Sequence, residues 1–289
     1  MSTLHTQLWL NTIEEKLKAN WEILTKIAKN DNINLKYNGV NRKVIIPNAG
    51  ADPVVTINST VFSQPIDDRV DTAVEYNVDV FRTQPTLVTR EDVVSVSYDK
   101  ISSIVETMFN VLGEAGMYTT FSRWFNVAQP KVQYTATFGV ADVLKAKEAL
   151  DAQGVPFSNR ILLLNAKHAN ELLTNMLLTN SNIAFVDNDG MGILNQPLYM
   201  FKVVQLPMVI EFASGGTTPV SYQNLGAVSN KSVSLAYHKD MVSVAKADSH
   251  IFHTPDSAAN FGDIISGEAY FGGKARRTDN KGVVQIFKA

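Results

Sequence analysis

The most regular pattern of hydrophobic and polar positions lies between residues 137 and 178. Its first half repeats apolar side chains near the 3.6-residue period of a helix, and Gly154 stands where a left-handed C′ residue ends such a helix. The continuous apolar run from Arg160 to Leu164 predicts a strand that is buried on both faces. Asn165 then occupies the N-cap position of a second helix, Ala166 to Leu178. The apolar positions of the first helix are Val140, Val143, Leu144, Ala146 and Leu150.

Apolar residues at three- and four-residue steps also predict an amphipathic helix over residues 8 to 29. These positions are Leu10, Ile13, Leu17, Trp21, Leu24 and Ala28. Two interpretations fit this helix. It packs on its own domain, or it is an N-terminal arm that docks on a neighbouring subunit.

Residues 36 to 96 change the pattern from helix to strand and turn. Arg42–Ile46, Pro53–Ile57 and Thr72–Phe81 are predicted strands, and Val93–Val96 closes the region. About sixty residues without a helix, and with few large apolar groups, cannot easily bury themselves. The segment is therefore predicted to be an extended β hairpin that has little core of its own and needs a partner surface.

A single apolar stripe predicts a helix over residues 97 to 115, with Gly113 and Gly116 near its end. The stripe consists of Ile101, Ile104, Val105, Met108, Val111 and Leu112. Downstream, residues 182 to 235 are predicted to be strands and loops, and Lys231 to Lys246 is strand-like. The chain as a whole therefore mixes helices and strands.

The 289 residues are 45% apolar and 19% charged, with a formal net charge of −2. These values are typical of an ordered soluble protein and argue against a dedicated nucleic-acid binder, which is usually strongly basic. The absence of cysteine excludes disulfide scaffolds, thiol catalysis and cysteine-type zinc sites. No signal-peptide pattern begins the sequence, and no apolar run approaches the ~18 residues of a membrane span. The composition indicates a protein that is made and kept in a cytoplasm.

The sequence contains no recognisable catalytic, cofactor-binding or metal-binding motif. The nearest approach to a phosphate-binding loop has Glu268 at the first glycine position and Ala275 after the lysine. His250 and His253 have acidic neighbours suited to a metal, but the segment is interpreted as a strand end and turn with solvated groups. His168 is interpreted as a surface or capping residue. We therefore expect no metal, no cofactor and no enzymatic activity.

The chain carries two blocks of opposite charge. Between Asp67 and Asp92 seven acids stand against three bases, a balance of −4, and from Gly272 to Ala289 five bases stand against one acid, a balance of +4. Either both blocks are solvated faces, or the acidic patch of one copy meets the basic patch of another and sets their register. The candidates for such contacts between subunits are Asp67, Asp68, Arg69, Asp71, Arg276 and Arg277.

The order of these elements resembles the major capsid proteins of tailed bacteriophages, which have the fold named after bacteriophage Hong Kong 97. The helix–turn–strand–helix unit of residues 137 to 178 is similar to the middle of those proteins. Three C-terminal segments are similar to their returning strands, namely Leu235–Ala245, Asn260–Tyr270, and Gly282–Phe287 after the pair Arg276 and Arg277. The order of elements over nearly the whole chain carries the resemblance.

This resemblance implies an α+β fold of five parts. They are an N-terminal helical arm (1–35), an extended β loop (36–96), a spine helix with the peripheral domain (97–139), a central α/β or axial domain (140–235), and returning strands of the peripheral domain (236–289). The sequence shows neither a scaffolding-type N-terminal extension nor a large inserted domain, which leaves open how assembly is directed.

The resemblance also implies a function. Hexamers and pentamers of identical copies would tile an icosahedral shell around double-stranded DNA, in a virion assembled in the bacterial host cytoplasm. The partners would be other copies of the chain, scaffolding and portal proteins, and DNA phosphates contacted weakly and without sequence preference, with no membrane.

Two alternatives stay open. An encapsulin-type nanocompartment shares the fold and encloses enzymes, and its genes would neighbour a cargo enzyme instead of portal and terminase genes. A cytoplasmic α/β enzyme with an unrecognised site would be a monomer with a deep polar cleft.

Overall fold

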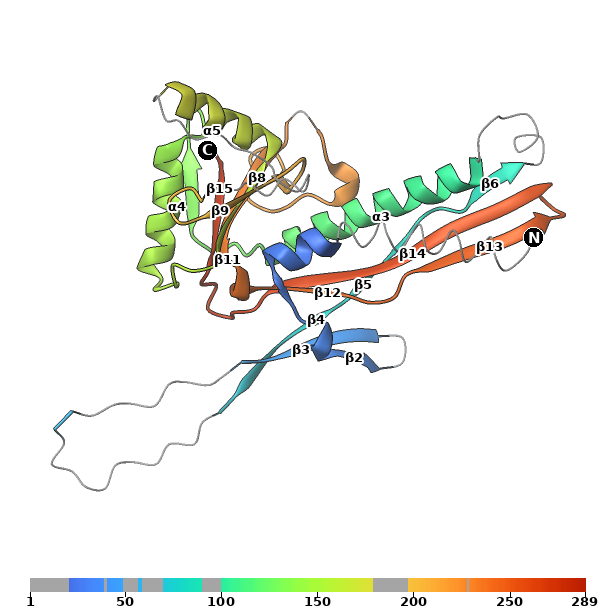
Figure 1. The fold of residues 1–289 in the computed structure, drawn as a ribbon, viewed down its shortest axis with the longest axis horizontal. Helices are drawn as coiled ribbons and strands as arrows, with labels where there is room; N and C mark the ends of the chain where they lie inside the picture. Colours follow the sequence, from blue (N-terminus) through green and yellow to red (C-terminus); the bar gives the residue numbers. More distant parts are fainter. Residues whose placement is uncertain are drawn as a thin grey trace.

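The computed structural model describes residues 21–38, 41–48, 57–58, 70–89, 100–178, 197–227 and 229–289. These residues form a compact α/β unit, a long arm built on one helix and paired strands, and a narrow β ribbon near the base of the arm (Figure 1). Each of the three parts contains a sheet. We call them the central sheet, the arm sheet and the ribbon sheet.

The central sheet follows the order β7-β15-β11-β8-β9, with β10 paired to β11. The strand bounds are β7 Lys131–Tyr134, β8 Arg160–Asn165, β9 Lys202–Leu206, β10 Ile210–Phe212, β11 Lys231–His238 and β15 Val283–Lys288. Helices α4 (Val140–Ala152) and α5 (Ala166–Leu178) pack on one face. The end of α3 (Lys100–Trp124) and the helical residues 21–27 cover the other face.

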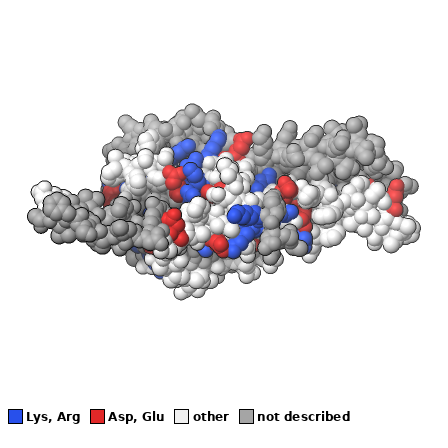
Figure 2. Space-filling view, turned by 90° about the horizontal axis from the view of Figure 1, so that it is seen from below, with Lys and Arg blue, Asp and Glu red and all other residues white. Residues whose placement is uncertain are grey.

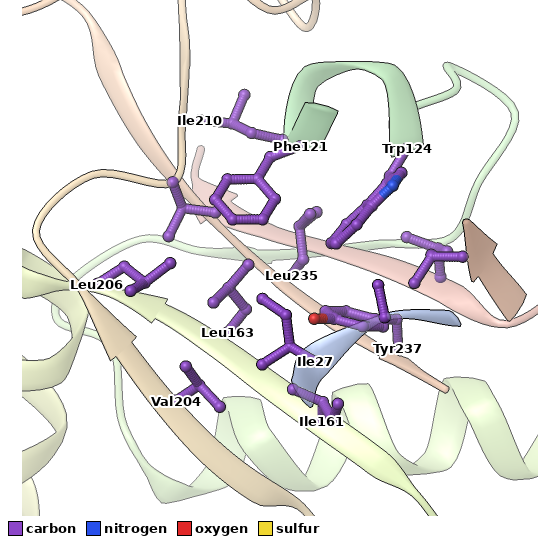
Figure 3. Packing of buried hydrophobic residues seen from close by; sticks show 14 of the residues in the cluster. Ile27, Phe121, Trp124, Ile161, Leu163, Val204, Leu206, Ile210, Leu235 and Tyr237 are labelled. Carbon is purple, nitrogen blue, oxygen red and sulfur yellow. The ribbon is translucent and has the colours of Figure 1, made fainter. Parts of the chain in front are cut away.

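All six residues of strand β8 are buried, because the sheet has a core on each side. Ile161 and Leu163 belong to one core, with Phe121 and Trp124 of α3 (Figure 3). Leu162 belongs to the other core, under α4 and α5. Each fully buried aliphatic side chain contributes roughly 1.5–3 kcal/mol relative to exposure. The structure confirms the predicted strand, its two-sided burial and both flanking helices.

The helix ends of this unit also follow the prediction. Gly154 has a left-handed φ of 68°, and Asn165 accepts a hydrogen bond at 2.8 Å from the backbone N–H of His168, as an N-cap does. The interpretation of His168 as a surface residue is wrong, because its ring is fully buried. Its Nε2 lies 2.6 Å from the Tyr134 hydroxyl and its Nδ1 lies 2.7 Å from the Ser234 hydroxyl. Burial lowers the pKa of His168 to about 4, so the ring is neutral near pH 7.

The arm sheet is built around the 14-residue strand β14. β12 and β13 pair antiparallel with β14, β1 lies parallel to β12, and β5 and β6 pair with β14 from the side opposite β13. The bounds are β1 Lys29–Asn30, β5 Asp79–Arg82, β6 Thr86–Thr89, β12 Val242–Lys246, β13 His250–Ser257 and β14 Gly262–Ala275. Helix α3 packs along one face of this sheet.

Helix α3 is longer than predicted. It runs through Gly113 and Gly116 to Trp124, which gives 25 residues and a length of about 37 Å. A Cβ atom at Gly116 would lie 2.3 Å from Cδ2 of Phe271 on β14. Glycine therefore allows the helix to approach the sheet closely at this point. Gly116 therefore marks a helix–sheet contact and not a helix end, and Gly113 lies inside the same helix.

The ribbon sheet consists of β2 (Leu35–Asn38), β3 (Asn41–Asn48) and β4 (Thr72–Asn77), paired antiparallel in that order. Its apolar side chains pack against the base of the arm sheet. The cluster contains Val44, Ile46, Val74, Tyr76 and Val78 of the ribbon side and Ala245, Ala247 and Tyr270 of the arm sheet.

The predicted β extension is divided between two sheets. The predicted strand Thr72–Phe81 forms β4 in the ribbon sheet and β5 in the arm sheet, and β6 also joins the arm sheet. These pairings attach residues 79 to 89 to a strand near the C-terminus, which local alternation cannot indicate. Most of Pro53–Ile57, all of Val93–Val96 and the first part of the predicted helix 8 to 29 lie outside the described residues.

Residues 236–289, which the resemblance assigns to returning strands, also divide between two sheets. β12, β13 and β14 lie in the arm sheet, whereas β15 lies between β7 and β11 in the central sheet. Val283 and Phe287 point into one core, and Val284 and Ile286 point into the other. A strand that is apolar on both faces needs two cores, and the central sheet has them.

Candidate assembly site

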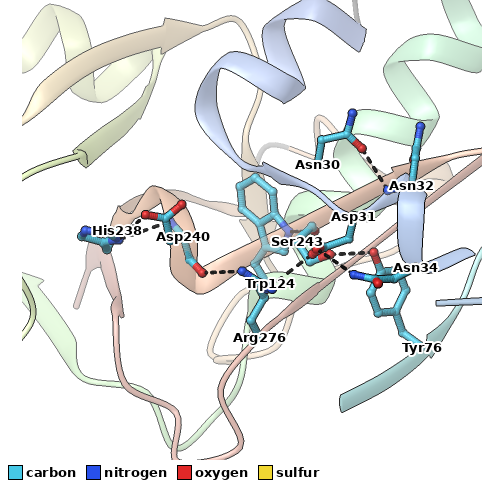
Figure 4. Close-up of polar contacts among 10 residues, drawn as sticks. All are labelled: Asn30, Asp31, Asn32, Asn34, Tyr76, Trp124, His238, Asp240, Ser243 and Arg276. Carbon is cyan, nitrogen blue, oxygen red and sulfur yellow. Dashed lines mark hydrogen bonds and ion pairs between the residues drawn. The ribbon is translucent and has the colours of Figure 1, made fainter. Parts of the chain in front are cut away.

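Five segments of the chain meet where the ribbon, the arm and the α/β unit join. We call this cluster the junction and define it by Asp31, Tyr76, Trp124, Ser243 and Arg276 (Figure 4). Asp31 follows β1, Tyr76 lies on β4, Trp124 ends α3, Ser243 lies on β12, and Arg276 follows β14. The junction therefore sets how the three parts are oriented.

An ion pair is the first component of the junction. The carboxylate of Asp31 is only 4% exposed, and its Oδ2 lies 3.4 Å from Nε of Arg276. The backbone N–H of Asp31 donates to the carbonyl of Val244 at 3.0 Å, and Arg276 donates to the carbonyl of Asp240 at 3.3 Å. A buried carboxylate is costly without a cation, so Arg276 holds the segment around Asp31 against the arm sheet.

A chain of hydroxyl and indole groups is the second component. The Tyr76 hydroxyl lies 2.7 Å from the Ser243 hydroxyl, and the indole N–H of Trp124 donates to the Ser243 carbonyl at 3.0 Å. Burial raises the pKa of Tyr76 well above its usual value, so the phenol keeps its proton. These bonds tie the ribbon and the end of α3 to the same residue of β12.

Asparagines fix the segment that enters the ribbon sheet. The side-chain oxygen of Asn32 accepts from the backbone N–H of Lys246 at 2.8 Å, and that of Asn30 accepts from the backbone N–H of Asn32 at 3.0 Å. The side-chain amide of Asn34 donates to the Asp31 carboxylate at 3.3 Å. Side chains therefore supply hydrogen bonds that a two-residue strand cannot.

Opposite charges also meet within the chain at the base of the ribbon. Glu75 forms an ion pair with Lys43, Asp79 forms one with Arg123, and Lys274 donates to the Glu75 carbonyl at 3.2 Å. In Figure 2 basic and acidic side chains are interspersed over the middle of the face seen from below. Part of the predicted acidic block is thus paired inside one chain.

The structure places the six predicted contact residues differently. Asp67, Asp68 and Arg69 lie outside the described residues. Asp71 lies just before β4 and is exposed, whereas Arg276 contacts Asp31, as described above. Arg277 donates to the carboxylate of Asp279 at 2.9 and 2.6 Å, and these bonds lower the pKa of Asp279 to about 2. Both arginines have an acidic partner in their own chain, and a contact with a neighbouring subunit stays a prediction.

Sequence reasoning missed a second buried charge, on β14. Glu268 is 5% exposed. Its Oε2 lies 2.5 Å from Nε of Arg82 on β5, and its Oε1 accepts from the Tyr270 hydroxyl. Burial alone would raise the pKa of Glu268, but the bonds from Tyr270 and Arg82 hold it below its usual value. The only signal in the sequence was a glutamate in a strand-like segment, which does not identify its partners.

The described residues contain no group of three or more side chains suited to a metal ion. His253 lies 3.3 Å from the Asp263 carboxylate, and both side chains are 9% exposed. The predicted turn at Pro255 is wrong, because β13 continues through Pro255 to Ser257. His250 is exposed, as the interpretation of solvated groups expects, whereas His253 is not. Proline is tolerated there because β13 is an edge strand. Among the described helices, none is both long and apolar enough to cross a membrane.

No family model matches the sequence, and no curated protein matches it. Several solved structures match the fold. A chain of Mycobacterium phage Che8 has a TM-score of 0.60 and 15% identity, over 91% of this chain and 90% of that chain.

Two further structures agree with this match. The capsid structure of cyanophage P-SCSP1u has a TM-score of 0.60 and 16% identity, over 91% and 86% of the two chains. The capsid of Ralstonia phage GP4 has a TM-score of 0.61 and 11% identity, over 90% and 86%. The chain therefore has the α+β fold of the Hong Kong 97 type, as its sequence predicts.

Proposed function

We propose that this chain is the major capsid protein of a tailed phage or prophage, many copies of which form an icosahedral shell. The observation that supports this most is the likeness in fold, over about nine tenths of both chains, to capsid chains of phages. The elongated form supports it as well, because an arm and a ribbon extend away from the compact unit (Figure 1).

The parts have separate tasks in this proposal. The central sheet, with a core on each face, is a rigid block. The arm and the ribbon reach beyond that block and contact neighbouring copies. Rings of six and five identical subunits need slightly different contacts, and the junction holds the base of the extensions while their outer parts adapt. Such contacts between different surfaces are heterologous and close into rings.

The remaining parts of the proposal follow if the chain forms a capsid shell. The function is structural and not enzymatic, and the protein resides in virions after assembly in the host cytoplasm. Packaged DNA would be contacted weakly through phosphates, in keeping with a net charge of −2. Scaffolding and portal proteins are further partners. An encapsulin-type shell is the alternative with the same fold, and it would contain an enzyme in place of DNA.

Electron microscopy of the full chain expressed in bacteria tests the proposal. Closed shells of uniform size support it, and a chain that stays monomeric under all assembly conditions, including the presence of its neighbouring genes, contradicts it. The content of the shells then separates the two alternatives. Genes for a portal and a terminase beside this gene favour a phage, and a co-purifying enzyme favours an encapsulin.

A further inference from the structure

We propose that His238 makes the crossing between the α/β unit and the arm sensitive to acid, so that the arm gains freedom to change its angle to the unit. The inference concerns a single chain and does not depend on the proposed function. The chain passes between the central sheet and the arm sheet at residues 239–241, which join β11 to β12, and at residues 276–282, which join β14 to β15. We call these two connections together the hinge.

Backbone hydrogen bonds hold the two connections of the hinge together. The N–H of Arg276 donates to the carbonyl of Met241 at 2.8 Å, and the N–H of His238 donates to the carbonyl of Gly282 at 3.0 Å. Strands of the central sheet lie on one side of these bonds, and strands of the arm sheet lie on the other. The conformation of the hinge therefore contributes to the angle between the two sheets.

The side chain of His238 fixes the first connection of the hinge. It is buried, and its Nδ1 accepts a hydrogen bond at 3.2 Å from the backbone N–H of Asp240. This bond caps the single turn η3 (Lys239–Met241). A backbone N–H can only donate, so Nδ1 carries no proton in this arrangement, and the neutral ring has its proton on Nε2. The hinge as it stands therefore requires the neutral form of His238.

A proton on Nδ1 of His238 conflicts with this arrangement in two ways. Nδ1 becomes a donor, so the N–H of Asp240 loses its acceptor and η3 loses its cap. In addition, His238 lies directly opposite Arg160 in the pairing of β11 with β8, and the charged side chain of Arg160 is fully buried. Like charges that stand directly opposite each other in a sheet are destabilising. The charged ring therefore favours a different conformation of the hinge.

Among the described residues, the charged groups that face His238 come from β8, α4 and η3. They are Arg160, its partner Asp151, and the Asp240 carboxylate, whose Oδ2 lies 3.9 Å from Nδ1 of His238. Burial is the main cause that lowers the pKa of His238, and Arg160 adds to it, whereas Asp240 and the backbone of Ser158 act in the opposite direction. The present hinge is therefore favoured above the ordinary histidine pKa and loses stability as the pH falls below it. The Asp240 carboxylate is the anion that the charged ring then attracts.

A change in η3 reaches the junction through Arg276 (Figure 4). The side chain of Arg276 donates to the Asp240 carbonyl at 3.3 Å and lies 3.4 Å from the Asp31 carboxylate. A shift of the Asp240 carbonyl therefore removes a contact that holds Arg276 beside Asp31. Acid thus loosens both the hinge and the segment that enters the ribbon sheet, and the arm gains freedom relative to the α/β unit.

A pair of spin labels tests the inference, because the natural chain has no cysteine. One cysteine replaces Glu148, which is exposed on α4, and the other replaces Thr254, which is exposed on β13. The labelled full chain is diluted with unlabelled chain, so that only distances within one chain are measured by electron paramagnetic resonance. We expect one narrow distance distribution at pH 7 and a broader or displaced one at pH 5, with an unchanged circular dichroism spectrum. The same distribution at both pH values would overturn the inference.

Two histidine variants assign the response to one residue. His238→Gln should abolish it, because glutamine does not titrate and its side-chain oxygen can accept from the N–H of Asp240. His168→Gln is the matched control, because His168 is also a buried histidine of the α/β unit but lies outside the hinge. It should keep the response of the natural chain. A response that persists in His238→Gln, or that disappears in His168→Gln, would contradict the assignment to His238.

Nuclear magnetic resonance of the natural chain gives a measurement that needs no variant at the hinge. With nitrogen-15 in the histidine rings, Nδ1 of His238 should be unprotonated at pH 7 and should bind a proton between pH 7 and pH 5, as the label distances change. A ring that already carries a proton on Nδ1 at pH 7 would overturn the inference. None of these measurements requires particles, so failure of the chain to form shells would contradict the proposed function alone.

Discussion

The central sheet and the arm sheet differ in how many of their faces are covered. The central sheet has a core on each side, so strands such as β8 and β15 bury every apolar residue within the chain. Among the described residues, the arm sheet has α3 on one face, and the ribbon sheet packs against the inner half of the other. A sheet covered on both faces buries its apolar side chains within the chain, whereas a sheet that is partly uncovered retains exposed apolar side chains.

The α/β unit also differs from the arm and the junction in where its buried charged residues find their partners. In the α/β unit the side chain of Arg160 is fully buried, lies 2.6 Å from the Asp151 carboxylate, and donates to the carbonyls of Val155 and Pro156. Its partners are all local. Two buried acids of the arm and the junction, Asp31 and Glu268, take their cations from segments far away in the sequence. A third, Asp263 on β14, lies beside His253 of the neighbouring strand, ten residues away. Local pairing stabilises a unit, and distant pairing fixes the arrangement of several units.

The largest expected effect on stability comes from creating a cavity in the core of the central sheet. Leu163→Ala should lower the free energy of unfolding by about 2–5 kcal/mol, because it removes buried methyl groups and leaves a cavity. Leu87→Ala, at a 41% exposed position of the arm sheet, should stay within about 0.5 kcal/mol in the soluble subunit. Urea unfolding followed by circular dichroism measures both values. Similar losses in the two variants would contradict the division between the sheets.

The acid stability of the central unit should depend on His168. Its folded pKa of about 4 lies below the ordinary value near 6.5, so the unfolded state binds the extra proton between these two pH values. The contribution of His168 to stability is therefore complete above pH 6.5 and decreases as the pH falls toward 4, by on the order of 3 kcal/mol. Urea unfolding at pH 7 and pH 4.5 measures the decrease.

Two variants isolate this effect from other titrating groups. His168→Gln should reduce the pH dependence, since glutamine can form hydrogen bonds with Tyr134 and Ser234 but does not titrate. His250→Gln is the matched control for replacing a histidine, because His250 is exposed on β13 and lies outside the central sheet. If the natural chain and His168→Gln lose equal stability on acidification, His168 is not the group responsible.

The free energy of unfolding should fall when Arg276 is replaced and should change little when Arg277 is replaced. Arg276→Met leaves the Asp31 carboxylate buried without its cation, and we expect a loss of about 1–3 kcal/mol in the free energy of unfolding. Arg277→Met removes a pair with Asp279 that is exposed and confined to one turn, so its effect should stay within about 0.5 kcal/mol. Thermal unfolding at one pH compares the two directly.

A double variant distinguishes charge from packing. Arg276→Met with Asp31→Asn removes both charges and should recover part of the lost stability. No recovery would mean that the aliphatic part of Arg276, and not its charge, supports the junction.

The smallest effect concerns the charge contact between subunits. Arg277→Glu should weaken particle formation at low salt, with about 0.2–1 kcal/mol for each exposed pair and less at high salt. Asp67→Lys with Asp68→Lys in the same chain should restore part of the yield, measured by sedimentation. Since Arg276 serves the fold of its own chain, Arg277 is the sharper probe. Normal yields from Arg277→Glu at low salt would refute the contact.

The sequence predicts local structure in this chain well and distant pairing poorly. The strand β8, its flanking helices and the turn at Gly154 follow from patterns within a dozen residues. The predicted end of α3 is wrong because the sequence does not distinguish a glycine that ends a helix from a glycine that allows another element to pack closely. Only the ring of Phe271 on β14 shows that Gly116 does the second.

The candidate site was only partly predictable for the same reason. The basic block identified Arg276 as a candidate contact residue. However, the partner of Arg276 is Asp31, which lies near the other end of the sequence and outside the acidic block. His168 could not be assigned to the core without the positions of Tyr134 and Ser234. The attachment of β5 and β6 to β14 likewise depends on a register that alternation alone does not contain.

The position of β15 has a consequence for synthesis. β15 lies between β7 and β11, so the central sheet stays open until residues through Lys288 have left the ribosome. A nascent chain that has reached only β11 exposes a bare strand edge, which invites pairing with other chains. Translation proceeds at about 5–20 residues per second, so this exposure lasts a few seconds in each chain. The central sheet therefore closes only after β15 has been synthesised, and chaperones that shield strand edges would act before that point.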